Sequence, residues 1–231
     1  MIRCVVFDFD GTLVDSNHIK RDAFLGIARG YPAGHEIMAR IIDVPGIGTR
    51  DTVFEKFVAD LGIAPDARGA MVAEMVACYA DRCFKDISRA DEIVGARAVL
   101  DRLVADRLRL FISSATPAGP LKDLVEARGL GTLMEGVFGA PESKDEHVRR
   151  IQRATGLSSS EILYVGDSDA DSRAAAAAKC PFVGVVLDEA RFSIRPEVCI
   201  TSLAQLPGVI EKLNAVDRGG TIWSYARSES N

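Results

Sequence analysis

Two aspartates, Asp8 and Asp10, stand one residue apart after an apolar run, and Gly11 follows them directly. The run from residue 2 to residue 7 is rich in valine and isoleucine, which predicts a buried strand. Because side chains alternate along a strand, both carboxylates would emerge on the same side if extended geometry continued. A hard cation such as Mg²⁺ suits such oxygens. Beside a bound phosphate, one carboxylate can act as nucleophile and the other can handle protons. The alternative is a purely structural role, in which the aspartate pair marks a solvated strand end or caps a helix.

Three further groups of polar residues follow later in the chain. Ser114 ends a second apolar run, Lys144 lies after a Gly-Ala-Pro loop, and Asp167 and Asp171 follow a third run. In an open parallel sheet, ligands bind at the carboxyl ends of the strands, so these groups would meet the aspartate pair at one edge. Alone, Ser114 could be a helix cap and Lys144 a solvated side chain. Together and in this order, they supply what phosphoryl transfer needs.

The elements that must position these residues are short strands alternating with helices. Strand-like apolar runs recur at four places, which are residues 2–7, 108–113, 162–165 and 182–187. Helical patterns separate the last three runs, and Ser158 with Glu161 indicates a short turn that enters the third run. This alternation predicts an α/β fold with a Rossmann-like, doubly wound parallel sheet covered on both faces.

The segment between the first two strand runs has a different pattern. Its apolar residues recur at helical spacing, and breakers at 30–32, 45–46 and 62–65 divide it into four helices. We therefore expect an inserted all-α cap domain over 15–92, with a core domain built from 1–14 and 93–213. The polar residues 214–231 are expected to form a C-terminal tail.

Composition excludes several classes of function. The net charge of −5 argues against a broad nucleic-acid surface. The five cysteines include no C-x-x-C pair, and the three histidines are scattered, so neither a disulfide framework nor a zinc site is indicated. A strand begins at residue 2 and no apolar run approaches the ~20 residues that span a bilayer, so we expect a cytoplasmic protein without a membrane partner.

With these motifs in order, the chain resembles the haloacid dehalogenase superfamily of phosphatases. The helical insertion resembles the cap of the subfamily that holds phosphoglycolate phosphatases and β-phosphoglucomutase. The resemblance implies that Asp8 is the nucleophile that becomes a phosphoaspartate, and that Asp10 is the general acid and base. It also implies a Mg²⁺ site made by Asp8, the backbone carbonyl of Asp10, and Asp167. Asp171 would orient either Lys144 or a metal-bound water.

The same resemblance assigns the phosphate contacts. Ser114 and the adjacent Ala115 match the phosphate-binding segment, and Lys144 matches the lysine that neutralises nucleophile and phosphate. Arg50 matches a cap arginine that grips a distal phosphate in β-phosphoglucomutase. It could equally be a solvated arginine at a helix start.

The implied reaction has two steps. Asp8 attacks phosphorus while protonated Asp10 donates to the leaving alkoxide, and Asp10 then takes a proton from the water that attacks the phosphoaspartate. Since an ordinary aspartate pKa is ~3.9, the pKa of Asp10 must be raised for this purpose. Neighbouring Asp8 and sparse solvent could raise it, whereas the metal would oppose this shift, so the geometry has to decide.

Two departures argue against phosphomutase activity. Lys20 stands where the mutase has a histidine, and Pro117-Ala118 replace its Lys-Asn pair. We therefore expect a phosphatase of a small phosphorylated metabolite. A phosphomutase and a non-catalytic binding protein are the alternatives. The sequence leaves open phosphoglycolate, sugar phosphates and nucleotides as substrates, and it leaves the oligomeric state open.

Overall fold

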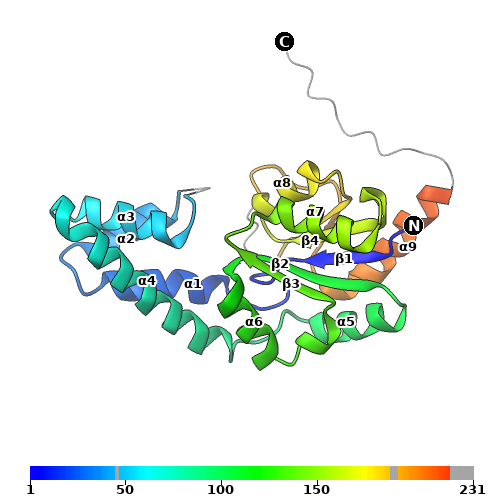
Figure 1. Ribbon diagram of the computed structural model, residues 1–231, viewed down its shortest axis with the longest axis horizontal. Coiled ribbons are helices and arrows are strands. Elements are labelled where there is room, and N and C mark those ends of the chain that lie inside the picture. Colours follow the sequence, from blue (N-terminus) through cyan, green and yellow to red (C-terminus); the bar gives the residue numbers. More distant parts are fainter. Residues whose placement is uncertain (45–46, 188–191, 219–231) are drawn as a thin grey trace, which may run out of the picture.

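A computed structural model describes residues 1–44, 47–187 and 192–218 (Figure 1). Its sheet has six parallel strands in the order β3-β2-β1-β4-β5-β6. The strands are β1 (Cys4–Phe7), β2 (Arg109–Pro117), β3 (Gly136–Ala140), β4 (Ile162–Gly166), β5 (Phe182–Val185) and β6 (Cys199–Ile200). The chain order reverses at β1, so β1 lies at the switch point, where α/β sheets place their ligands.

Helices cover both faces of this sheet, as the doubly wound prediction requires. On one face lie α7 (Lys144–Thr155) and α8 (Asp169–Ala177). On the other lie α5 (Ala96–Ala105), α6 (Ala118–Ala127) and α9 (Leu206–Arg218). Short 3-10 turns η1 (Gly131–Leu133), η2 (Ser159–Glu161) and η3 (Leu203–Gln205) lead into β3, β4 and α9. None of the helices within the described residues is long and apolar enough to cross a membrane.

The strand sequences explain the two covered faces. Val5 and Phe7 of β1 belong to one buried apolar cluster, whereas Cys4 and Val6 belong to a second. The strand β4 alternates in the same way. Because successive side chains point to opposite faces, a continuous apolar run fits a strand that is buried on both sides.

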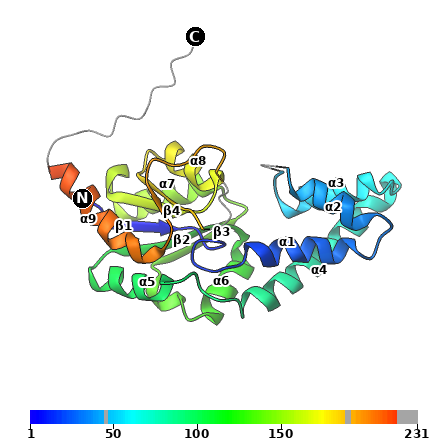
Figure 2. The same ribbon diagram turned by 180° about the vertical axis from the view of Figure 1, so that it is seen from behind.

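Four helices form an all-α insertion between β1 and α5. They are α1 (Asn17–Ala28), α2 (Gly34–Ile42), α3 (Arg50–Asp60) and α4 (Pro65–Ile87). From behind, α1 and α4 run side by side away from the end of the sheet, and α2 and α3 pack on them (Figure 2). The four-helix prediction is confirmed, although the breaker at 45–46 lies outside the described residues.

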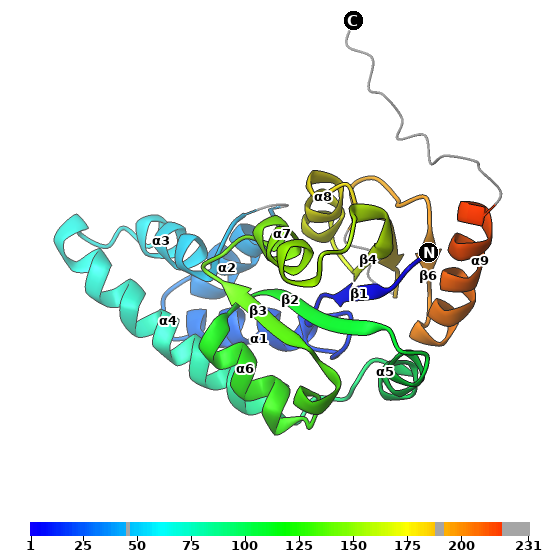
Figure 3. The same cartoon turned by 45° about the vertical axis from the view of Figure 1, so that its right-hand side comes forward.

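The insertion is joined to the sheet by two adjacent connections. Val14 forms an antiparallel bridge with Glu92, and the Asp15 amide donates to the Asp91 carbonyl at 3.0 Å. Turning the molecule shows α4 beside α6, which is a second contact between insertion and sheet layer (Figure 3). The carboxyl ends of β1, β2 and β4 therefore face the insertion.

The sheet is larger than the sequence runs predict. The strand β2 continues to Pro117 instead of ending at residue 113, and β3 and β6 were not predicted. The strand β3 has two glycines among five residues, and β6 has only two residues, so neither carries an apolar run. Helix α9 continues to Arg218, beyond the predicted end at 213, while residues 219–231 of the predicted tail lie outside the described residues.

Candidate active site

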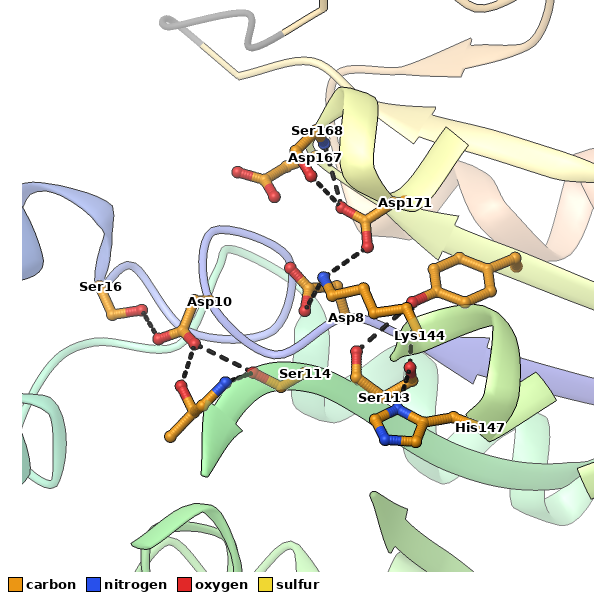
Figure 4. Close-up of polar contacts among 12 residues, drawn as sticks. Asp8, Asp10, Ser16, Ser113, Ser114, Lys144, His147, Asp167, Ser168 and Asp171 are labelled. Atoms are coloured by element: carbon orange, nitrogen blue, oxygen red, sulfur yellow. Dashed lines mark hydrogen bonds and ion pairs between the residues drawn. The ribbon is translucent and has the colours of Figure 1, made fainter. Parts of the chain in front are cut away.

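Asp8 and Asp10 lie at the carboxyl end of β1 and are both buried (Figure 4). The Asp8 amide donates to the Val165 carbonyl at 2.9 Å, which fixes its backbone against β4. The chain then turns at Gly11, whose φ is +77°; an added Cβ would lie 2.3 Å from Asp167 Oδ2. A glycine is therefore required for this turn. The two carboxylates share the sheet edge, but each has its own set of partners.

Lys144 lies between Asp8 and Asp171. Its Nζ is 2.8 Å from Asp8 Oδ1 and 2.7 Å from Asp171 Oδ1. Lys144 is the first residue of α7, and Asp171 belongs to the first turn of α8, so two helix starts meet over β1. Gly166 leaves room for this arrangement, because a Cβ there would lie 2.4 Å from Asp171 Cγ. From the sequence, Asp171 is expected to orient either Lys144 or a metal-bound water. Its contact with Lys144 fits the first of these roles.

The cluster carries more negative than positive charge. Burial raises the pKa of Asp8, and the nearby Asp171 carboxylate raises it further, against the attraction of Lys144. For Lys144, burial lowers the pKa, but attraction to Asp8 and Asp171 outweighs this effect and raises it overall. An additional cation would thus stabilise the ionised form of Asp8.

The residues present fit a divalent metal ion. Asp8, Asp167 and Asp171 are buried, and one carboxylate oxygen of each lies within 4.8 Å of the others. Hard carboxylate oxygens are the ligands that Mg²⁺ prefers. Asp167 is also held by Asn17, whose Nδ2 donates to its Oδ2 at 2.7 Å. This side-chain cluster includes Asp171 beside the expected Asp8 and Asp167; the expected contribution of the Asp10 backbone carbonyl stays a prediction.

Asp10 has a separate set of partners. Its Oδ1 accepts a hydrogen bond from Ser16 at 2.7 Å, and its Oδ2 accepts from Thr116 at 3.0 Å and Ser114 at 3.3 Å. Lys20, on helix α1 of the insertion, places its Nζ 2.5 Å from the same Oδ2. The carboxylate therefore joins strand β2 to helix α1.

The raised pKa that proton donation by Asp10 needs is not found in this arrangement. Burial does raise it, but the charge and hydrogen bond of Lys20, together with Ser16 and Thr116, lower the pKa overall. A positive charge and donors favour the ionised carboxylate. As the structure stands, Asp10 is a carboxylate, which is suited to accept a proton.

The other predicted residues take the following places. Ser114 is buried near the end of β2, and its Oγ accepts a hydrogen bond from the Thr116 amide at 3.0 Å, so it does not cap a helix. Ala115 and Arg50 both line a cavity of about 400 Å³ between the insertion and the sheet edge. Arg50 is also the first residue of α3, which agrees with the alternative that it is an arginine at a helix start.

Sequence reasoning missed four contacts of the aspartates. Ser16 and Asn17 follow the aspartate motif by a few residues, and Thr116 follows Ser114, so proximity in the chain was a usable signal for all three. Lys20 was noted only as a departure from the mutase. Its contact with Asp10 depends on where the first turns of α1 lie, which local patterns do not give.

A buried cluster of polar side chains, Ser113, His147 and Tyr164, lies beneath Lys144. Ser113 Oγ is 2.9 Å from Nδ1 of His147, and the Tyr164 hydroxyl donates to Ser113 Oγ at 3.2 Å (Figure 4). His147 lies on α7 one turn after Lys144, and Ser113 precedes Ser114. These contacts tie α7 to strands β2 and β4.

Comparisons with known proteins agree with this geometry. Residues 5–185 match the model of the haloacid dehalogenase-like hydrolase family. A phosphoglycolate phosphatase of Rhodospirillum rubrum is 31% identical over 217 residues, covering 88% of this chain and 86% of the relative. One from Cereibacter sphaeroides (strain ATCC 17029) is 29% identical over 185 residues, covering 77% and 82%.

Solved structures share the fold. A predicted phosphoglycolate phosphatase of Haemophilus somnus 129pt superposes with a TM-score of 0.73 at 21% identity, covering 90% of this chain and 98% of the other. CbbY of Rhodobacter sphaeroides, solved with xylulose-1,5-bisphosphate, gives 0.67 at 16% identity, covering 89% and 96%. The described strand order, the convergent aspartates and these matches lead to one conclusion. The chain belongs to the haloacid dehalogenase-like hydrolase family and is a phosphatase of that family.

Proposed function

We propose that this phosphatase is Mg²⁺-dependent and hydrolyses a small phosphorylated metabolite through a phosphoaspartate on Asp8. The observation that carries the proposal is Lys144, whose ammonium lies within 2.8 Å of both Asp8 and Asp171 at the end of β1. A buried carboxylate held beside a lysine and near further carboxylates has the surroundings of a nucleophile for an anionic phosphate.

In the first step, an oxygen of Asp8 attacks phosphorus and the bond to the leaving alcohol breaks. Lys144 offsets negative charge on both the nucleophile and the phosphate, which otherwise repel each other. The hydroxyl of Ser114 and the backbone at Ala115 hold the phosphate oxygens in line. Mg²⁺ held by Asp8, Asp167 and the Asp10 carbonyl would supply further positive charge to the phosphate oxygens.

Asp10 handles the protons. In the second step, its carboxylate accepts a proton from the water that attacks the phosphoaspartate, and this fits its lowered pKa. In the first step, Asp10 has to donate a proton to the leaving alkoxide. That donation requires the 2.5 Å contact with Lys20 to lengthen once substrate is bound, because this contact favours the ionised carboxylate.

The helical insertion 15–92 would act as the cap. Its helices α1 and α3 line the 400 Å³ cavity together with Ala115 and Thr116, which directly follow the phosphate-binding serine. Substrate enclosed there would be separated from bulk water while the phosphoryl group is transferred to Asp8. Arg50, which lines the same cavity, is proposed to contact the substrate there.

The relatives support a small phosphorylated substrate. The curated matches given above are phosphoglycolate phosphatases, which makes phosphoglycolate the first compound to assay. YfnB of Bacillus subtilis, a putative hydrolase solved with bound magnesium and with interdomain movement, shares the fold with a TM-score of 0.69 at 19% identity, covering 90% of this chain and 98% of that one.

The test is phosphate release from p-nitrophenyl phosphate with and without Mg²⁺. We expect Mg²⁺-dependent turnover that falls about 10⁴-fold or more in Asp8→Asn, because the nucleophile is removed. Asp101→Asn, an exposed aspartate of α5, is the matched control and should keep the wild-type rate. Full activity in Asp8→Asn would overturn the proposal. Isomerisation of a phosphosugar without net phosphate release would replace it with a phosphomutase.

A further inference from the structure

The wall of the cavity beside the phosphate site is mainly apolar. Helices α1, α3, α4 and α6 contribute Phe24, Val53, Tyr79, Phe84 and Leu124, and Ile47 precedes α3. On the sheet side, the cavity is closed by Ala115 and Thr116. Lys20, which contacts Asp10, also lines it. The cavity therefore adjoins the catalytic edge. With phosphorus at Asp8, as proposed above, the alcohol part of the substrate would enter it.

Two residues of this wall, Phe24 and Tyr79, pack together with Phe54 in an aromatic cluster. The rings of Phe24 and Tyr79 are 4.3 Å apart between centroids, and Phe54 lies 5.2 Å from Phe24 and 6.0 Å from Tyr79. The Tyr79 side chain is buried, and its hydroxyl has Cys83 as a hydrogen-bonding partner. Rings held in this way present a preformed apolar surface, which lowers the entropy cost of binding.

The positive charges around the cavity are mostly neutralised within the protein. Lys20 lies 2.5 Å from Asp10, and Arg21 lies 2.6 Å from Asp43. Arg50 is 3.9 Å from Asp51, the loosest of the three pairs. A glycolate carboxylate would have to compete with Asp43 for Arg21 or with Asp51 for Arg50, whereas an apolar group gains contact area without displacing either pair.

The volume of the cavity also favours a large alcohol part over a short anionic one. At about 400 Å³, the cavity falls in the range of pockets that enclose ligands much larger than a two-carbon acid. A short anionic alcohol would leave most of the aromatic wall in contact with water. A ring-sized alcohol would cover it.

We propose that the preferred substrate is a phosphate monoester whose alcohol part carries an apolar, ring-sized body that packs on Phe24, Tyr79 and Phe84. The inference rests on the proposed function for the phosphate end only. It names the class of leaving group, and it sets this chain apart from its phosphoglycolate phosphatase relatives.

The kinetic test compares kcat/KM for methyl, butyl, hexyl and benzyl phosphate with that for phosphoglycolate. One buried methylene is worth about 0.8 kcal/mol, so each added methylene that reaches the wall should raise kcat/KM about fourfold. We expect benzyl phosphate to exceed both methyl phosphate and phosphoglycolate at least ~10-fold. A flat series, or a preference for phosphoglycolate, overturns the proposal and leaves the phosphatase assignment standing.

Two variants test whether the aromatic residues of the cavity cause the preference for benzyl phosphate. Phe24→Ala should reduce the benzyl-to-methyl ratio of kcat/KM about 10-fold, and Phe84→Ala, at a 40% exposed position that tolerates substitution, about threefold. Val94→Ala removes a more exposed apolar side chain outside the cavity, so it should leave the ratio unchanged. An unchanged ratio in both Phe24→Ala and Phe84→Ala contradicts the proposed wall.

A binding measurement separates this inference from the chemistry. Calorimetry with Mg²⁺-containing protein compares benzylphosphonate, methylphosphonate and phosphonoacetate, none of which needs to be hydrolysed. Tighter binding of benzylphosphonate by ~10-fold or more supports the apolar site even if no substrate is turned over. In that case only the proposed function fails. Equal affinities, or tighter phosphonoacetate binding, reject the apolar site whatever the turnover.

Discussion

Lys20 extends from helix α1 of the insertion to Asp10 of the sheet edge, with Nζ 2.5 Å from Oδ2. The same ammonium donates to Thr116 Oγ1 at 3.1 Å, and Thr116 in turn donates to Asp10. One carboxylate thus connects the predicted cap to strand β2, which carries the proposed phosphate-binding residues. This contact contributes to the lowered pKa of Asp10, and it links the insertion to the residue that we propose as the general acid and base.

Lys20→Met should destabilise the protein. The substitution leaves the buried Asp10 carboxylate without its cation, although three hydroxyl donors remain. We expect the free energy of unfolding in urea to fall by about 1–3 kcal/mol, less than for a fully buried pair because Lys20 is partly exposed. Lys122→Met, which removes an exposed lysine 3.9 Å from Glu126, should change it by less than about 0.5 kcal/mol. Adding Asp10→Asn to Lys20→Met should restore part of the loss; strict additivity would contradict the pairing.

Asp171→Asn should impair catalysis more than folding. The amide keeps the shape of the side chain but weakens its hold on Lys144, which stays 2.8 Å from Asp8. We expect kcat to fall about 10–100-fold. Circular dichroism should be unchanged, and Asp101→Asn should retain full activity. A wild-type kcat in Asp171→Asn would show that Lys144 does not depend on this partner.

Mg²⁺ should stabilise the folded protein through the carboxylate cluster. A ligand that binds only the native state adds about 2.7 kcal/mol of stability at 100 times its Kd. We therefore expect the melting temperature to rise with added Mg²⁺ and to fall again with a chelator. Asp167→Asn, which removes one charged member of the cluster, should abolish most of this shift. A shift of equal size in this variant would place the metal elsewhere.

His147 should make stability depend on pH. Burial lowers its pKa below the ordinary 6.5, because the neutral ring beside Ser113 is favoured in the fold. The unfolded chain then binds the proton more readily. The stabilising contribution is complete above about pH 6.5 and is lost as the pH falls toward the lower folded-state pKa. The loss is at most about 1.4 kcal/mol per pH unit for one group.

The measurement compares urea unfolding of wild type and His147→Gln at pH 8 and pH 5.5. His147→Gln carries no titrating ring, so its stability should change less between the two pH values than that of the wild type. Equal changes in the two proteins would mean that His147 is not the group responsible.

Much of the fold could be predicted because the strands β1 and β4 are continuous apolar runs followed by aspartates. Since parallel strands end at one edge, the meeting of Asp8, Lys144 and Asp167 needed no knowledge of side-chain packing. Strand β3 escaped prediction because its two glycines interrupt any apolar pattern. The Lys20 contact escaped because it joins two layers whose relative position is set by packing between α1, α4 and α6. The cavity wall could not be predicted from the sequence for the same reason.

The most direct test of the central claim is to trap the phosphorylated residue. Asp10→Asn is mixed with p-nitrophenyl phosphate and Mg²⁺, because this leaving group needs little proton donation while the next step lacks its base. The quenched protein is reduced with borohydride, which converts an acyl phosphate of aspartate to homoserine, and its peptides are identified by mass spectrometry. The account predicts homoserine at position 8. Modification of another aspartate, or none during turnover, would contradict it.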